Sequence, residues 1–141
     1  MPSIFALVLW LTTSLASATA ATPVDEPDWP QWRGPNRTGI SDETGLLTSW
    51  PEGGPKVAWS VKGLGAGYGS VSIQDQWIFV QGTEGNDSVV FALNRADGKR
   101  VWTRSLGPTL EQDRGPGPRG TPTVDGEHIY ALTEAGDLAS V

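Results

Sequence analysis

The chain contains no cysteine, and it has a single histidine and a single methionine among its 141 residues. Without cysteine it has no disulfide framework, no thiolate zinc site, no haem attachment and no lipidated N-terminal cysteine. Positive charge is also scarce, with 10 Lys and Arg against 16 Asp and Glu, which gives a net charge of −6. Because no basic run offsets this balance, we do not expect the chain to bind nucleic acid.

Helical signals are missing as well, whereas turn-forming residues are abundant. The chain has 18 glycines and 11 prolines, which counts against a helical bundle. No stretch carries apolar residues at helical spacing for more than two turns. Tryptophan dominates the aromatic residues, with seven Trp against three Phe and two Tyr. This composition predicts an all-β fold.

Residues 1–20 carry no charged side chain and are typical of a signal peptide. Ile4–Leu11 is apolar, and Ala18 and Ala20 occupy the −3 and −1 positions of a signal peptidase site. We therefore expect cleavage after Ala20 and a periplasmic or secreted product. The apolar run is far shorter than the roughly 20 residues of a spanning helix, so the chain is not expected to cross a membrane. Since no Lys or Arg precedes this run, an uncleaved anchor or a misassigned start codon is the alternative.

Short strand-like runs separated by turn signals fill the rest of the chain. Residues 21–55 form a Pro- and Gly-rich lead-in, in which Thr22–Pro30 is interpreted as a linker, and residues 56–141 hold the strands. Hairpins are predicted around Gln74–Gln76, at Asp97-Gly98 and at Asp125-Gly126, the last being a strong two-residue turn signal. The predicted strands are Lys56–Val61, Ser70–Ile73, Trp77–Gln81, Ser88–Asn94, Arg100–Leu106, Thr121–Val124, His128–Thr133 and Asp137–Val141.

An internal repeat organises these strands. Gly69–Val80 aligns without gaps on Gly120–Ala131 at an offset of 51 residues, and hydroxyl, β-branched, turn and aromatic positions coincide. Val57–Ser60 matches Arg100–Thr103 at an offset of 43 residues. A period of about 40–50 residues built of four short strands is typical of a β-propeller of four-stranded antiparallel blades. A sandwich or barrel is the alternative, although it gives no reason for the same pair of strands to return.

The second hairpin carries a tryptophan motif. Ala92, Asn94, Gly98 and Trp102 stand at the spacing of the pattern A-x-D-x-x-T-G-x-x-x-W. The segment resembles the tryptophan-docking motif of the pyrroloquinoline-quinone-like β-propeller repeats. It departs from that pattern at Asn94, where the family usually has Asp, and at Asp97, where Thr is commonest.

The residue types of the motif suit the docking of a ring. Ala92 is small where a neighbouring ring must fit, and Gly98 can adopt the positive φ of a tight hairpin. Trp102 can then lie across the gap to the next blade, burying roughly 150–250 Å². Trp59 is interpreted as the docking residue of the preceding blade.

Two further stretches are similar to exported bacterial members of this superfamily. Asp28–Ser41 resembles the segment that precedes their first blade, and Gly115–Gly126 resembles a blade entry. Closed propellers have four to eight blades, whereas residues 21–141 hold only about two and a half. The chain is therefore interpreted as the N-terminal part of a longer propeller.

The superfamily contains both enzymes and scaffolds. Its quinoprotein dehydrogenases bind pyrroloquinoline quinone and Ca²⁺ on the propeller axis, whereas the propeller scaffold of the outer-membrane β-barrel assembly machinery is not an enzyme. The vicinal disulfide that such dehydrogenases can use, and their Asp base beside a bound Ca²⁺, have no counterpart here. The resemblance thus implies an exported, non-catalytic binding or scaffolding module, without a cofactor, that contacts protein partners through propeller faces. The alternative is an N-terminal fragment of a pyrroloquinoline-quinone-dependent dehydrogenase, with the quinone and calcium as cofactors.

No local group of side chains predicts a catalytic, cofactor-binding or metal-binding residue. The repeat alignment sets His128 opposite Trp77, at an ordinary strand position. Glu84–Ser88 lacks the ligand spacing of a calcium loop and is expected to be a turn, and Gly63–Gly69 lacks the Lys-Ser/Thr of a phosphate loop. Asp113–Arg119 is expected to be a connecting loop with solvated cations, or alternatively a contact to a carboxylate or a partner.

Overall fold

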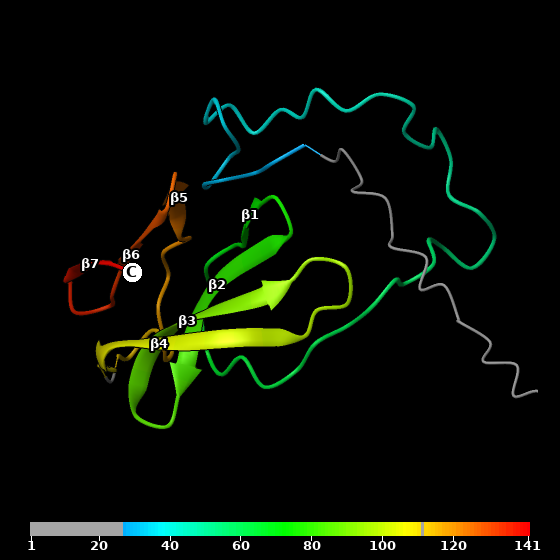
Figure 1. Cartoon of the computed structure of the whole chain (residues 1–141). Helices are drawn as coiled ribbons and strands as arrows, with labels where there is room; N and C mark the ends of the chain where they lie inside the picture. The colour runs from blue at the N-terminus through cyan, green and yellow to red at the C-terminus, as the bar shows by residue number, and fades with distance from the viewer. Residues whose placement is uncertain (1–26, 111) are drawn as a thin grey trace, which may run out of the picture.

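The computed structural model describes residues 27–110 and 112–141, and within them the fold is all-β, as predicted. The predicted signal peptide lies outside the described residues. The described strands are β1 (Ser72–Gln74), β2 (Trp77–Glu84), β3 (Asp87–Asn94), β4 (Arg100–Pro108), β5 (Thr123–Asp125), β6 (His128–Leu132) and β7 (Leu138–Ser140) (Figure 1). The three predicted hairpins are confirmed, since β1–β2, β3–β4 and β5–β6 are antiparallel pairs.

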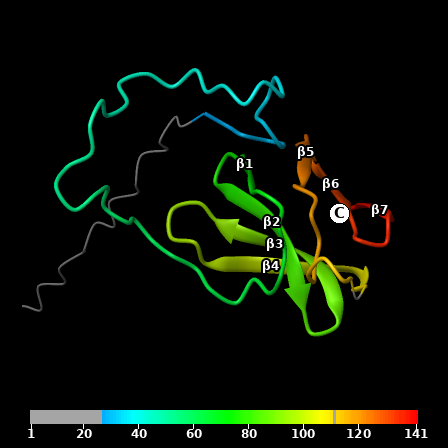
Figure 2. The ribbon, with the colours of Figure 1, turned by 180° about the vertical axis from the view of Figure 1, so that it is seen from behind.

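The strands form two antiparallel sheets in which neighbours in space are neighbours in sequence. Sheet A has the order β1-β2-β3-β4, and sheet B has the order β5-β6-β7. The first strands of the two sheets, β1 and β5, contact each other. Figures 1 and 2 show sheet B beside sheet A when the molecule is viewed from the front and from behind.

The centre of sheet A is buried on both faces, and its strand β3 is apolar at consecutive positions. Val89, Phe91 and Leu93 belong to one hydrophobic cluster, whereas Val90 and Ala92 belong to another. All five side chains are almost completely buried. A strand covered on both sides has a continuous apolar sequence rather than an alternating one, and Val89–Leu93 is such a run.

The cluster that contains Val90 and Ala92 joins the two sheets, and we call it the inter-sheet cluster. Sheet A contributes Phe79, Val90 and Ala92, and sheet B contributes Val124, Ile129 and Ala131. On the opposite face of sheet A, the apolar side chains pack against Trp59, Val61 and Leu64, which precede the first strand. Each face of sheet A is therefore covered by a different part of the chain.

The prediction of a strand at Lys56–Val61 is wrong. The segment lies along sheet A, but it has no ladder, and no described residue hydrogen-bonds to its backbone. A strand assignment requires a partner strand. The repeat equivalent of this segment, Arg100–Thr103, pairs with β3, whereas no described strand lies beside Lys56–Val61.

The lead-in is joined to both sheets through three residues. The Asp28 carboxylate accepts the Asp75 N–H over 2.8 Å. Trp29 and Ile73 exchange two backbone hydrogen bonds, each 2.9 Å long, and the Val124 N–H donates to the Pro30 carbonyl over 2.8 Å. The interpretation of Thr22–Pro30 as a linker is therefore wrong at its last three residues. Residues 35–58 then arch away from the sheets and return (Figures 1 and 2).

Candidate docking site at the second hairpin

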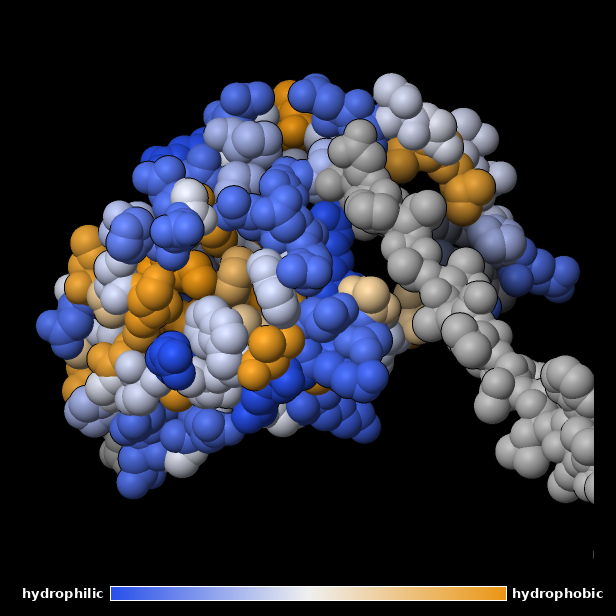
Figure 3. Space-filling model, in the orientation of Figure 1, coloured by the Kyte–Doolittle hydropathy of each residue, from blue (hydrophilic) through white to orange (hydrophobic). Residues whose placement is uncertain are grey.

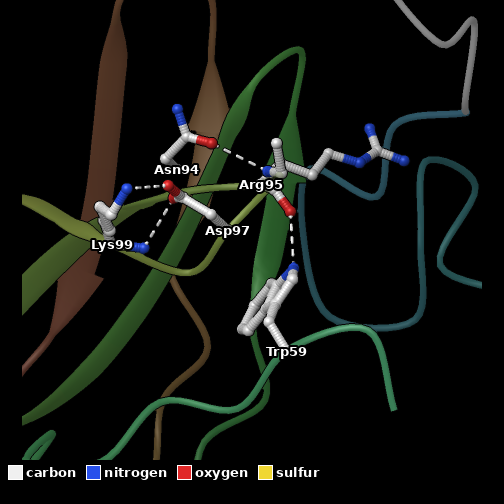
Figure 4. Close-up of polar contacts among 6 residues, drawn as sticks. Trp59, Asn94, Arg95, Asp97 and Lys99 are labelled. Atoms are coloured by element: carbon white, nitrogen blue, oxygen red, sulfur yellow. Dashed lines mark hydrogen bonds and ion pairs between the residues drawn. The ribbon is translucent and has the colours of Figure 1, made fainter. Parts of the chain in front are cut away.

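The turn between β3 and β4 is held by the short polar side chain of the tryptophan motif. The Asn94 side-chain oxygen accepts the Ala96 N–H over 2.9 Å, and the Asn94 carbonyl accepts the Gly98 N–H over 2.8 Å. Asn and Asp favour such turns because their side-chain oxygen reaches the backbone N–H two residues further on. Asn94 can therefore fill the place that Asp usually has in this motif (Figure 4).

An exposed ion pair completes the turn. The Asp97 carboxylate accepts the Lys99 backbone N–H over 3.0 Å and lies 2.7 Å from the Lys99 ammonium. Hydrogen bonds from the Lys99 side chain and backbone lower the pKa of Asp97, and the same side-chain contact raises the pKa of Lys99. Because both groups face solvent, their attraction is screened and the pair contributes little to stability.

Trp59 docks on this turn from the segment that precedes sheet A. Its indole N–H donates to the Arg95 carbonyl over 3.0 Å, as Figure 4 shows. Its ring covers Gly98, where an added Cβ would lie 2.5 Å from the ring atom Cε3. Gly98 also has a φ of 70°, so glycine is required both by the backbone conformation and by the close approach of the ring.

The other half of the motif lies on the opposite face of sheet A. Ala92 is paired with Trp102 across β3 and β4, and the extra residue Val101 forms a bulge next to the tryptophan. The Trp102 ring packs against the inter-sheet cluster, 5.9 Å from the Phe79 ring centre. A bulge can re-aim a neighbouring side chain. The structure thus brings Trp59 to Gly98 and Trp102 to Ala92, as two separate contacts on two faces.

The two repeats touch at positions that are equivalent in the alignment. The Ser70 N–H donates to the Thr121 hydroxyl over 3.0 Å. The two residues are 51 positions apart in the sequence, which is the repeat offset. Gly69 lies so close to its own equivalent that an added Cβ would overlap the carbonyl oxygen of Gly120. Sequence reasoning missed these contacts, although the offset identified the residues as equivalent.

A second contact of this kind is made by a buried side chain of β2. The Gln81 amide nitrogen donates over 3.1 Å to the carbonyl of Leu132, which is again 51 residues away. Gln81 is almost completely buried, so its hydrogen bond crosses between the sheets inside the protein. These contacts add polar links to the apolar inter-sheet cluster.

The loop Asp113–Arg119 uses one of its two arginines to hold itself together. The Arg119 guanidinium lies 5.3 Å from the Tyr68 ring centre. It donates to the carbonyls of Arg114, Gly115 and Gly117 and to the side-chain oxygen of Gln112. The expectation that both cations are merely solvated is therefore wrong for Arg119, whose donors serve the loop.

The remaining candidates have ordinary structural positions. His128 is exposed on β6, with Nδ1 3.4 Å from the Ser140 hydroxyl. The turn predicted within Glu84–Ser88 lies at Gly85-Asn86, between β2 and β3. A cleft of about 270 Å³ is lined by Gln74, Asp75, Trp77, Phe79, Val124, Gly126, Glu127 and Ile129. Three of these residues belong to the inter-sheet cluster, so the cleft is the open end of the interface between the sheets. Across residues 27–110 and 112–141, no three His, Asp or Glu side chains gather in a possible metal site.

Comparisons with protein-family profiles, with curated proteins and with solved structures found no match to this chain. In the described part of the chain, no helix has the length and apolar character needed to cross a membrane.

Proposed function

We propose that the chain is an exported β-propeller repeat protein that serves as a non-catalytic binding or scaffolding module. The observation that carries this proposal is the contact between equivalent residues of the two repeats, at Gly69 with Gly120 and at Ser70 with Thr121. When identical units are related by rotation, a residue can touch its own equivalent only if it lies close to the rotation axis. These contacts precede β1 and β5, which fits an arrangement in which the first strand of each sheet lies innermost.

The order of the strands supports the same arrangement. Both sheets follow the sequence outward from their first strand, as the blades of a propeller do. The docking of Trp59 on the turn between β3 and β4 suits a contact between successive units, because Trp59 is interpreted as the docking residue of the preceding blade. A sandwich provides no reason for contacts to recur at one sequence offset.

Two charged side chains of the loops, those of Arg119 and Asp97, are engaged in holding the fold, which suits a non-catalytic role. Arg119 is bonded to four oxygen atoms of its own loop, and Asp97 is bonded to the turn that it belongs to. The lead-in, in contrast, presents large apolar side chains to solvent, which suits contacts with other proteins. They are Trp32, Ile40, Leu46, Leu47 and Trp50.

Binding of the quinone distinguishes this function from that of a dehydrogenase. We expect the exported chain, in equilibrium dialysis with pyrroloquinoline quinone and Ca²⁺, to retain no stoichiometric quinone at micromolar concentration. A dye-linked assay with alcohols and sugars is expected to show no oxidation above the rate without protein. Stoichiometric sub-micromolar binding, or turnover that depends on the quinone, would overturn the non-catalytic proposal.

A further inference from the structure

The cleft at the open end of the inter-sheet interface lies between equivalent turns of the two repeats. The turn between β1 and β2 is Asp75-Gln76, and the turn between β5 and β6 is Gly126-Glu127. The two turns are 51 residues apart in the sequence, which is the repeat offset. All the residues that line the cleft belong to these two turns or to β1, β2, β5 and β6. The cleft is therefore a feature of two neighbouring units and of the way in which they pack.

The inner lining of the cleft is apolar and includes an indole ring. Phe79, Val124 and Ile129 are buried members of the inter-sheet cluster. Trp77 lies two residues before Phe79 on β2, so it is on the same face of sheet A, and it is only half-buried. The equivalent of Trp77 in the second repeat is His128, so the repeat does not require tryptophan at this position. The cleft thus offers part of an indole ring to a ligand.

The outer lining of the cleft is acidic. Asp75 and Glu127 line it from the two turns, and both residues are exposed. Neither carboxylate forms a hydrogen bond or an ion pair with any described residue. None of the described residues that line the cleft is a lysine or an arginine. The cleft therefore has two negative charges at its rim that the lining itself does not neutralise.

The backbone of Asp75 is held in place by two charged side chains. Its N–H donates to the Asp28 carboxylate over 2.8 Å, and its carbonyl accepts the Arg95 guanidinium over 3.2 Å. Its φ of 52° lies in the left-handed region, which Asp tolerates better than most residues do. Asp28 and Arg95 thus fix the turn through its backbone and leave the Asp75 carboxylate for another partner. A group that is already in place loses little freedom when a ligand binds.

An indole ring, an apolar interior and an acidic rim together suit a cationic group on an apolar stem. A guanidinium is attracted to the face of an indole ring, and its donors match the geometry of carboxylates. A bare metal ion takes oxygen ligands, which the apolar interior does not supply. The cleft has a volume of about 270 Å³. Sites for drug-sized ligands have about 300–1,000 Å³, so the size of the cleft suits a single side chain.

We propose that this cleft binds an arginine side chain of a partner protein. The inference rests on the proposed function as a binding module and names the chemistry of one contact with the partner. The guanidinium stacks on Trp77 and pairs with Asp75 and Glu127, while the methylene groups of the stem contact the apolar interior. Arginine is favoured over lysine because a planar group can stack and form several directed hydrogen bonds at once. Figure 3 shows hydrophilic side chains over the end of the molecule where β1 and β5 lie, which suits contact with a charged partner.

Titration of the labelled chain with a short blocked peptide, N-acetyl-Gly-Arg-Gly-amide, tests this contact by nuclear magnetic resonance. The signal to follow is the indole N–H of Trp77, which is assigned by its loss in Trp77→Phe. We expect a saturable shift of this signal, with a dissociation constant in the millimolar range. The same peptide with citrulline keeps the shape of arginine without its charge, and it should bind at least about fivefold more weakly. A lysine peptide should also bind more weakly than the arginine peptide.

A double variant tests the acidic rim without disturbing the fold. Asp75→Asn with Glu127→Gln removes both charges, and Asn tolerates the left-handed φ of position 75 as Asp does. We expect it to bind the arginine peptide at least about fivefold more weakly than the parent chain. The matched control is Asp42→Asn with Glu52→Gln, which removes two exposed carboxylates outside the cleft and should bind like the parent.

Three results would each overturn the assignment of the cleft to arginine. They are the absence of a saturable shift at Trp77, binding of the citrulline or lysine peptide as tight as that of the arginine peptide, and a rim variant that binds like the parent. None of them bears on quinone binding. Retention of the quinone would instead refute the non-catalytic function, so the two failures are distinguishable.

Discussion

Replacing Trp59 with Ala is expected to lower the free energy of unfolding by about 3 kcal/mol, measured from urea denaturation. The substitution removes the ring that covers Gly98 and part of the apolar cover of sheet A. It also leaves the Arg95 carbonyl without the indole N–H that it accepts. A loss of this size is a large share of the roughly 5–15 kcal/mol that stabilises an ordinary domain.

Two further tryptophan variants separate the contributions of the ring and the hydrogen bond. Trp59→Phe keeps an aromatic ring and loses the N–H, so we expect it to cost about 1 kcal/mol. Trp50 is 70% exposed, and Trp50→Ala should change the stability by no more than about 0.5 kcal/mol. If Trp59→Ala were as mild as Trp50→Ala, the docking of Trp59 on the turn would be refuted.

Replacing Gly69 with Ala is expected to cost about 3 kcal/mol, because the added Cβ would overlap the carbonyl oxygen of Gly120. Both atoms are fixed in the backbone, so the two repeats must move apart to make room. Gly53→Ala is the matched control. Its Cβ would meet no atom within 4 Å, and its φ of 86° alone should cost about 1 kcal/mol. Equal urea midpoints for the two variants would contradict the close approach of the repeats.

The hairpins could be predicted from the sequence because local signals determine them. Asp125-Gly126 is a two-residue turn signal, and the turn between β5 and β6 lies one residue further on, at Gly126-Glu127. Asp97-Gly98 marks the second hairpin, whose strands β3 and β4 are joined by the five residues 95–99. The strand predicted at Lys56–Val61 has the same apolar pattern, yet it does not form a ladder. The pattern of apolar residues indicates that the backbone tends to be extended. A ladder also requires a neighbouring strand, which the pattern alone does not supply.

The contacts of the candidate site were only partly predictable. The spacing of Ala92, Gly98 and Trp102 singled out the motif, but the motif does not say which ring meets which residue. The structure pairs Gly98 with Trp59, which is separated from it by most of sheet A in sequence. The bonds of Trp29 and Pro30 to the two sheets are isolated, non-local contacts, and no periodicity predicts them.

The contact between equivalent residues of the two repeats is the central claim, and nuclear Overhauser spectroscopy of the labelled chain tests it most directly. The amide of Ser70 lies 3.0 Å from the hydroxyl oxygen of Thr121, 51 residues away. We predict a cross-peak between the Ser70 amide proton and the side-chain protons of Thr121. A spectrum with strong cross-strand peaks between β2 and β3 but without this inter-repeat peak would contradict the account.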